Sequence, residues 1–400
     1  MRLRLGMLAL ASSVALASCT DSGPAPVETV ANSRARASSV AGARGLGVPA
    51  NARKEEALFA RLSQTAPSAA GMYYDSLGTL VVRVRDASDD NAASNAVRSM
   101  LSAMLIVGSG RGRAARDVRV ERAQYTYREL SEWREQVFDL FFGRDLRVTS
   151  LDLDERQNRV VIGLAVDSFS ATRNAVAEKL ASVGVDTNAV RFTKAAAGRP
   201  DVLMAAPQQL VDQTSDPLAG GLILDIDNNG TWANCTLGLV ADRNGQRGLI
   251  TNSHCTSQMF NPDADQFYQR FPRLVATASV DPNAYTCGVQ RCRGADAMFA
   301  SAAAGASMAV GKVVKTQASN GGGYGGGWGT LYVDQAKPYF TVVATGDALV
   351  GTRINKVGIT TGWTWGDVAG TCVDGYILMN GYINVIRCED EADYVAYDGD

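Results

Sequence analysis

The residue best suited to acid–base chemistry in this sequence is its single histidine, His254. A histidine side chain can take up and return a proton near neutral pH, so any imidazole catalysis in this chain must come from this position. Apolar residues from Leu249 lead up to His254, and Cys255 follows it directly. The pattern predicts a strand that ends at the histidine, with a cysteine able to fasten it in place. A buried structural histidine is the alternative interpretation.

Asp296 is a candidate carboxylate partner for this histidine, because it lies among small and apolar residues (Ala295, Ala297 and Met298). A carboxylate near the core is costly unless it is paired. The Nδ1–H group of a histidine is a suitable partner, because the carboxylate then fixes the tautomer and stabilises the imidazolium. A structural aspartate at a strand edge is the competing interpretation. Two rival aspartates, Asp281 and Asp242, stand in evident turns.

The elements that must position these residues are predicted to be short strands. From Gly220 onward, apolar runs at 222–226, 235–241 and 248–251 alternate with turn sequences at 227–230 and 242–245. Strands and turns at this spacing are typical of an all-β sandwich or barrel. The glycine-rich stretch 320–329 lacks the strand–loop–helix context of a phosphate-binding loop, and we interpret it as a surface connection.

Residues 55–195 have a different pattern, which predicts an α+β domain. We expect helices at 91–106, 126–142 and 171–183, where apolar residues recur at helical spacing, and strands at 80–84, 148–153, 160–166 and 189–193. The last part is a β-β-α-β unit without an evident catalytic constellation. Residues 196–217 form no clear element, so we place a linker there.

The N-terminus resembles an export signal. Residues 1–19 carry Arg2 and Arg4 before a short apolar stretch, and they end in Leu16-Ala17-Ser18-Cys19. This ending resembles a bacterial lipobox, in which the cysteine is lipidated, so Cys19 is the predicted lipidation site. A cleaved signal with an incidental cysteine is the alternative. Residues 20–54 are rich in Ala, Ser, Gly, Pro and Arg, which predicts a flexible tether.

Composition and cysteine usage point to an exported globular protein. The net charge is −2, which gives no reason to expect a nucleic-acid partner. Apart from Cys19, all cysteines lie in the C-terminal half, and in an exported chain they suggest three disulfides. With one histidine, a structural zinc site is a poor interpretation, and we expect neither metal nor cofactor. The sequence leaves the pairing open, and nearest-neighbour pairing gives Cys235–Cys255, Cys287–Cys292 and Cys372–Cys388.

Four segments together resemble the chymotrypsin-like serine peptidases, and most of all their bacterial streptogrisin and α-lytic protease branch. The resemblance covers about residues 218–400. The matching segments are Leu249 to Cys255, Ala295 to Met298, Val357 to Val368 and Tyr394 to Asp400. The resemblance implies a double β-barrel and protein or peptide substrates. It also implies that His254 is the general base, that Asp296 is its orienting carboxylate and that Gly399 is an oxyanion-hole donor. The histidine-loop disulfide of the family matches Cys235–Cys255.

The sequence departs from this pattern at its C-terminus, because Asp400 stands one residue before the expected nucleophilic serine. Ser253 adjoins His254 on a predicted strand, where neighbouring side chains point to opposite faces, so we do not expect it to substitute. Cys255 fails for the same reason, and it is a predicted disulfide partner. The strands that close the second barrel would also follow Asp400. We therefore expect a fragment of a longer gene product, without triad activity in residues 1–400.

The bacterial branch is commonly made with an N-terminal pro-region, and the unit at 147–193 resembles the end of such a region more weakly. The sequence thus predicts an exported, lipid-anchored precursor of a serine endopeptidase, held in the bacterial cell envelope or released by processing. An accessory binding domain is the alternative for residues 55–195. The alternatives for the whole chain are a binding or scaffold lipoprotein on a degenerate protease fold, and a surface-layer or adhesion lipoprotein.

Overall fold

The computed structural model divides the chain into two compact units, 1–41 and 42–400, and every described residue lies in the second. The predicted signal, the lipidation site Cys19 and nearly all of the tether fall outside the described residues. No described helix is long and apolar enough to cross a membrane. The described residues are 54–104, 118–142, 144–145, 147–195, 210, 216–228, 231–261, 264–321, 327–343, 345–346, 348–379, 382–397 and 399–400.

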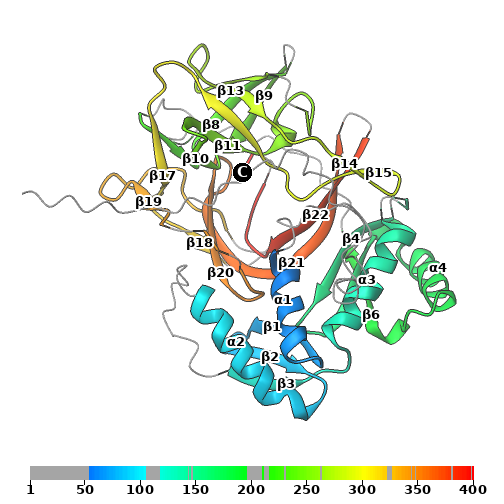
Figure 1. Cartoon of the computed structure of the whole chain (residues 1–400). Helices are drawn as coiled ribbons and strands as arrows, with labels where there is room; N and C mark the ends of the chain where they lie inside the picture. The colour runs from blue at the N-terminus through cyan, green and yellow to red at the C-terminus, as the bar shows by residue number, and fades with distance from the viewer. Residues whose placement is uncertain are drawn as a thin grey trace, which may run out of the picture. The chain divides into compact units, whose positions relative to one another are not determined.

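The part that precedes residue 196 contains helices and strands at the predicted places, and in addition helix α1 and strands β1 and β3, which were not predicted (Figure 1). Helix α3 begins where the sequence allows it, because Thr126 and Glu129 form a reciprocal capping box at its first turn. Strand β5 pairs in parallel with β6 across helix α4, which completes the β-β-α-β unit. Its elements are α1 Lys54–Thr65, β1 Ala69–Tyr74, β2 Leu80–Val84, α2 Asp90–Met104, β3 Val118–Arg122, α3 Tyr127–Phe141, β4 Val148–Asp154, β5 Arg159–Ala165, α4 Phe169–Ser182 and β6 Val190–Ala195.

The part from residue 218 onward is built from strands, which confirms the predicted β texture. Most of the linker 196–217 lies outside the described residues. The strands are β7 Leu218–Gly220, β8 Ile223–Asn228, β9 Thr231–Thr236, β10 Leu239–Arg243, β11 Gln246–Thr251, β12 Gln266–Tyr268, β13 Leu274–Val280, β14 Tyr285–Cys287, β15 Gln290–Arg293, β16 Met298–Ala302, β17 Met308–Val314, β18 Asn320–Gly321, β19 Tyr339–Thr341, β20 Arg353–Gly358, β21 Gly362–Met379 and β22 Tyr382–Ala392.

A seven-stranded sheet carries the histidine and aspartate segments. Its order is β10-β11-β16-β13-β12-β8-β9, and its apolar side chains fill one buried cluster that includes Leu224, Leu249, Phe267 and Val275. Strand β11, which leads to His254, pairs with β16, which follows Asp296. This pairing is what brings the two predicted site residues to the same end of the sheet. The strand order is open as described, so closure into a barrel remains a prediction.

The predicted strand at 235–241 is two strands, which corrects the sequence interpretation. Strand β9 pairs with β8, whereas β10 pairs with β11, so the chain changes partner between them at Leu237 and Gly238. A side chain at Gly238 would meet the backbone oxygen of Ile250 at 3.0 Å. The close approach of two backbones at the bend explains why glycine occupies this position.

A nine-stranded sheet joins the two parts of the described chain, which the sequence did not predict. Its main path runs β14-β15-β22-β21-β4-β5-β6, with the long strands β21 and β22 at its centre. The link is an antiparallel pairing of β21 with β4, in which Asp374 stands opposite Leu151. The β-β-α-β unit therefore continues the sheet formed by the C-terminal strands. The glycine-rich stretch also contributes here, because β18 pairs in parallel with β21.

A buried ionic cluster stabilises the contact between the two parts of the described chain. Arg134 from α3 binds Asp374 at 2.9 Å and also donates to the carbonyl oxygen of Cys372 at 2.7 Å. Arg387 from β22 binds the other carboxylate oxygen of Asp374 at 3.0 Å, and its guanidinium lies 3.6 Å from the ring centroid of Phe138. Their side chains are at most 4% exposed. Buried charges are costly unless paired, so the junction depends on keeping all of these partners together.

Candidate active site

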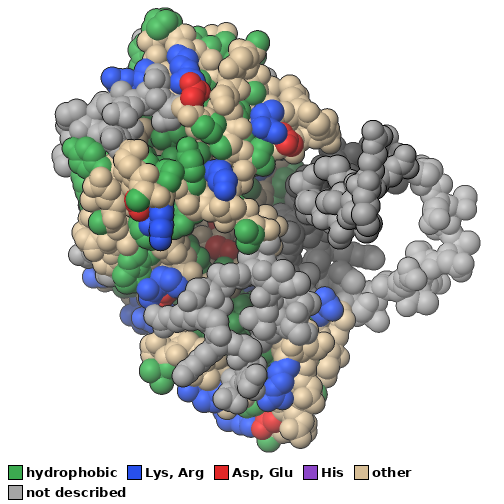
Figure 2. Space-filling view, turned by 90° about the vertical axis from the view of Figure 1, so that its left-hand side faces the viewer, with side chains coloured by type: hydrophobic (Ala, Val, Ile, Leu, Met, Phe, Trp, Pro, Cys, Tyr) green, Lys and Arg blue, Asp and Glu red, His purple; other side chains and the backbone are tan. Residues whose placement is uncertain are grey.

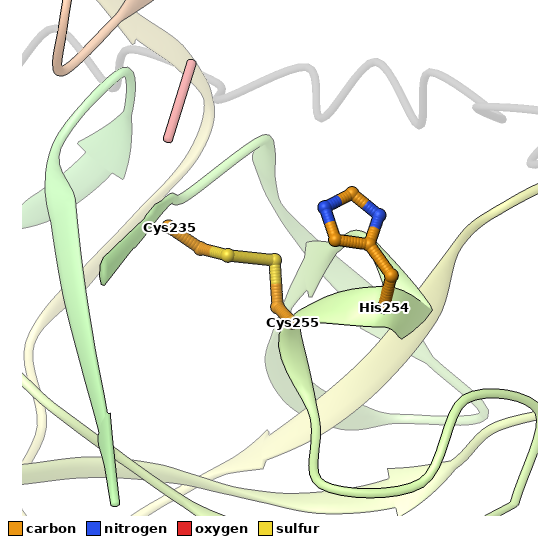
Figure 3. Close-up of side chains that lie close together, drawn as sticks. All are labelled: Cys235, His254 and Cys255. Atoms are coloured by element: carbon orange, nitrogen blue, oxygen red, sulfur yellow. A yellow bond between two sulfur atoms is a disulfide. The ribbon is translucent and has the colours of Figure 1, made fainter. Parts of the chain in front are cut away.

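The histidine segment is a short helical turn at the end of an apolar strand. Strand β11 ends at Thr251, and residues Ser253–Cys255 then form a 3₁₀ turn. Cys255 is bonded to Cys235 at the end of β9, as predicted. Figure 3 shows the imidazole of His254 beside this disulfide, and one ring nitrogen lies within 4.8 Å of both sulfur atoms, so the bridge holds the turn next to the ring. The His254 side chain is 42% exposed.

The structure brings the two predicted residues of the dyad together. The Nδ1 atom of His254 contacts the Oδ2 atom of Asp296 directly. The backbone N–H group of His254 also donates to Oδ1 of Asp296 at 3.0 Å, and Asn252 donates to Oδ2 at 3.4 Å. The Asp296 side chain is 7% exposed, so its charge is held among protein donors rather than water. The carboxylate thereby fixes the ring orientation and leaves Nε2 free of this contact.

This geometry suits proton transfer at Nε2. When Nδ1 carries the proton that Asp296 accepts, Nε2 is the basic nitrogen, and the carboxylate stabilises the imidazolium that forms when Nε2 takes a proton. The partial exposure of His254 allows a substrate group to reach it. The arrangement can therefore act as a general base towards an alcohol or water placed beside the ring.

Ser253 is not a nucleophile, although the reason differs from the one predicted. It was expected on a strand, but it lies in the 3₁₀ turn with His254. Its side chain is fully buried and its Oγ atom donates to Asp281 at 2.7 Å. The hydroxyl also accepts the backbone N–H of Phe260 at 2.8 Å. The sulfur of Cys255 is used in the disulfide, so neither neighbour of His254 offers a reactive group.

The two rival aspartates have other partners. Asp242 pairs with Arg247 across the β10–β11 hairpin. Asp281 is nearly completely buried rather than in an exposed turn, and it pairs with Arg293. Sequence reasoning missed Arg293 altogether. Its only signal was its place beside Cys292, just before the segment that carries Asp296.

Thr236 connects the C-terminal turn at Gly399 to Thr251, the last residue of the strand that leads to His254. The Thr236 hydroxyl donates to the carbonyl oxygen of Gly399 at 2.5 Å and accepts the backbone N–H of Ile359 at 3.1 Å. The carbonyl of Thr236 accepts the hydroxyl of Thr251 at 3.0 Å. Gly399 has φ +87°, a backbone conformation that favours glycine. Sequence reasoning missed Thr236, which follows the disulfide residue Cys235.

The side chain of Asp400 organises this turn. It accepts the backbone N–H groups of Thr360 and Thr361 at 2.9 Å and that of Tyr397 at 3.0 Å. It also pairs with Lys356 at 2.7 Å, and only 4% of the Asp400 side chain is exposed. Burial lowers the pKa of Lys356, and the charge of Asp400 opposes that shift. The buried pair fixes the backbone at the end of the described chain.

A third carboxyl group lies beside the dyad, at Glu389 on β22. Its Oε1 atom accepts the backbone N–H of Asp296 at 3.3 Å. Desolvation by the surrounding protein raises the pKa of Glu389 to about 7, with the negative charge of Asp296 adding to the shift. The residue as a whole nevertheless remains exposed, so water screens much of this effect. Sequence reasoning did not single out Glu389, since its position depends on the β21–β22 hairpin.

Cys235, His254 and Cys255 gather within 4.8 Å of one another, which resembles a metal-binding group. Both sulfur atoms are joined in the disulfide, so they cannot act as thiolate ligands, and the group offers a single imidazole nitrogen. The remaining cysteines pair as Cys287–Cys292 and Cys372–Cys388, which completes the nearest-neighbour pairing. Three disulfides fit an oxidising, extracytoplasmic location.

Comparison with known proteins gives limited similarity. No model of a protein family and no curated protein sequence matches the chain. Among solved structures, a Nocardiopsis protease is similar over 46% of this chain and 74% of its own, with 16% identity and a TM-score of 0.30. A glutamic acid-specific serine protease is similar over 46% of this chain and 76% of its own, with 16% identity and a TM-score of 0.29. Cellulomonas bogoriensis chymotrypsin is similar over 46% of this chain and 73% of its own, with 21% identity and a TM-score of 0.28. At these scores the similarity alone does not place the chain in a family.

Proposed function

We propose that this chain belongs to an exported serine endopeptidase, in which His254 and Asp296 form a catalytic triad with a serine supplied directly after Asp400. The observation that carries the proposal is the contact between Nδ1 of the single histidine and a nearly buried carboxylate. Gly399 stands in a fixed turn that Thr236 links to the histidine segment. A base, its orienting carboxylate and a backbone donor are the groups that serine acyl transfer requires.

In this mechanism the serine oxygen attacks the carbonyl carbon of a peptide bond while Nε2 of His254 accepts the hydroxyl proton. The N–H of Gly399 stabilises the negative oxygen of the tetrahedral intermediate. The C–N bond then breaks as His254 returns the proton to the leaving amine. Water, deprotonated by His254, next hydrolyses the serine ester and restores the hydroxyl. Asp296 stabilises each imidazolium. No cofactor takes part.

Residues 55–195 are proposed to be a pro-region that assists folding and restrains the enzyme until it is removed. Support comes from the junction itself: β4 extends the sheet of β21 and β22, and Arg134 reaches the buried Asp374. The strands beyond residue 218 make many pairings between distant residues, and such topologies fold slowly without help. Lipidation at Cys19 and processing between residues 196 and 219 belong to the same proposal.

The decisive experiment expresses the gene product with the residues encoded after Asp400 and measures cleavage of a denatured protein substrate. We expect His254→Ala to reduce the rate by at least about 10³-fold, because the base is lost. Asp242→Asn is the matched control, since that aspartate pairs with Arg247 on the hairpin instead. A residue other than serine after Asp400 would favour a binding protein, and full cleavage activity in His254→Ala would exclude catalysis at this site; either result would refute the proposal.

A further inference from the structure

A second ion pair, nearly buried, lies behind the His254–Asp296 dyad. Arg293 at the end of β15 binds Asp281, and the two side chains are 9% and 1% exposed. A buried pair of charges is costly to desolvate, and replacing it with apolar side chains is often neutral or stabilising. Stability alone is therefore a weak reason for its presence, and its other contacts indicate a different role.

The Asp281 side of the pair holds the histidine segment. Its Oδ2 atom accepts the hydroxyl of Ser253 at 2.7 Å and the backbone N–H of Asn261 at 3.0 Å. The Ser253 hydroxyl in turn accepts the backbone N–H of Phe260. Asp281 is thus bonded to both ends of the stretch 253–261. Since His254 is the second residue of that stretch, its backbone is fixed relative to Asp281.

The Arg293 side holds the aspartate segment. While Nη1 binds Asp281, Nη2 donates to the carbonyl oxygen of Ala297, the residue after Asp296. The guanidinium also lies 4.8 Å from the ring centroid of Phe260, which lies in the stretch 253–261 that carries His254. A planar fork of donors can reach two acceptors at fixed geometry, which a lysine cannot do. Arg293 therefore spans both segments.

We propose that Arg293 and Asp281 are positioning residues, which lock the segment carrying His254 to the segment carrying Asp296 and so set the contact within the dyad. The inference deepens the proposed function, on which its catalytic meaning rests. The hydrogen bonds of the two residues lead to the segments that carry the dyad. Their effect passes through Ser253 on one side and Ala297 on the other, and it should be visible in the state of His254 itself.

The single histidine makes this measurable by NMR, because the imidazole resonances of the full chain can come only from His254. The titration of His254 gives its pKa in the parent and in each variant. Asp296→Asn sets the reference for a lost carboxylate, and we expect it to lower the pKa of His254 by about 1 unit or more. We expect Arg293→Gln to lower that pKa by at least half as much as Asp296→Asn does.

The sign of this shift separates positioning from a direct charge effect. Removal of a nearby positive charge would by itself raise the pKa of an imidazole. A lower pKa in Arg293→Gln therefore means that the contact with Asp296 has loosened. A raised or unchanged pKa in a folded Arg293→Gln protein would overturn the proposal.

Controls guard against general loss of structure. Glu121→Gln breaks a partly buried ion pair with Arg83 in the separate sheet β1-β2-β3, and it should leave the His254 titration unchanged. If Arg293→Gln does not fold, Arg293→Lys and Ser253→Ala give milder tests, since each removes one link while keeping the net charge. We expect both to lower the pKa of His254, and an unchanged value in both would refute the proposal. The readout needs no serine, so failure of the proposed function would appear separately in the cleavage assay.

Discussion

Replacement of Asp152 by asparagine should stabilise the protein at neutral and alkaline pH but not at acidic pH. Asp152 lies on β4 at the junction with β21, where its Oδ2 atom would be 3.0 Å from a side chain placed at Gly370. Within the described chain, its Oδ1 atom has no hydrogen-bond partner. Burial raises the pKa of Asp152 to about 7, and the negative charge of Asp154 adds to the shift, against the opposing charge of Arg134.

The magnitude follows from the difference between this pKa and the ordinary aspartate value of 3.8. Because the pKa is raised on folding, the native protein holds a proton that the unfolded chain has lost between these two values. Stability must then fall as the pH rises through this window. The full shift would correspond to about 4 kcal/mol at 1.36 kcal/mol per unit. Because the Asp152 residue is partly exposed, water reduces this effect, and we expect the free energy of unfolding to change by about 2 kcal/mol.

Urea unfolding at a series of pH values tests this prediction. The free energy of unfolding of Asp152→Asn minus that of the parent should increase by about 2 kcal/mol between pH 4 and pH 8. The exposed Asp167 of the same region supplies the matched control, and Asp167→Asn should show no such trend. A difference for Asp152→Asn that stays constant with pH, or decreases, would refute the raised pKa of this carboxyl at the junction.

Two further changes test the elements that hold the site and the junction. Replacing Cys235 and Cys255 together by alanine removes a disulfide with a sequence separation of 20. Thermal unfolding should show a loss of about 3 kcal/mol in the free energy of unfolding, and a loss below about 1 kcal/mol would mean that the bridge adds little constraint. Asp374→Asn leaves Arg134 and Arg387 without their shared buried carboxylate, so denaturant unfolding should report a loss of about 3–5 kcal/mol. A neutral effect would contradict the structure of the junction.

His254 could be predicted from a local signal, whereas Asp296 was favoured over a structural aspartate only because the other segments resemble a known family. An apolar strand leads to His254, and small and apolar residues surround Asp296. These signals report burial and strand ends, which depend on near neighbours. The helices α2, α3 and α4 and the strands β2, β4, β5 and β6 were predicted for the same reason, since amphipathic periodicity is also a local property, whereas α1, β1 and β3 were missed. The sequence left the cysteine pairing open, and the structure has the nearest-neighbour set.

The supporting contacts could not be predicted, because they join residues that are far apart in the sequence. Asp281 looked like a turn residue, and only the fold brings it under Ser253 and beside Arg293. The same holds for Asp374, which meets Arg134 through the pairing of β21 with β4. Charged residues in such places resemble surface residues until tertiary structure buries them. The turn at Ser253 was missed because the preceding apolar run favours continued strand.

Charge on the molecular surface gives little further guidance about partners. On the face shown in Figure 2, lysine and arginine side chains are dispersed among hydrophobic ones, and several stand next to an acidic side chain. Surface ion pairs of this kind contribute little to stability, and their dispersion gives that face no single dominant sign.

The most direct test of the central claim is covalent labelling with a serine-directed phosphonate. The gene product extended beyond Asp400 should form one adduct, which peptide mapping places on the residue directly after Asp400. The adduct should disappear in His254→Ala, because the serine then lacks its base. Residues 1–400 alone should remain unlabelled. An adduct on residues 1–400, or equal labelling of the His254→Ala variant, would contradict the account.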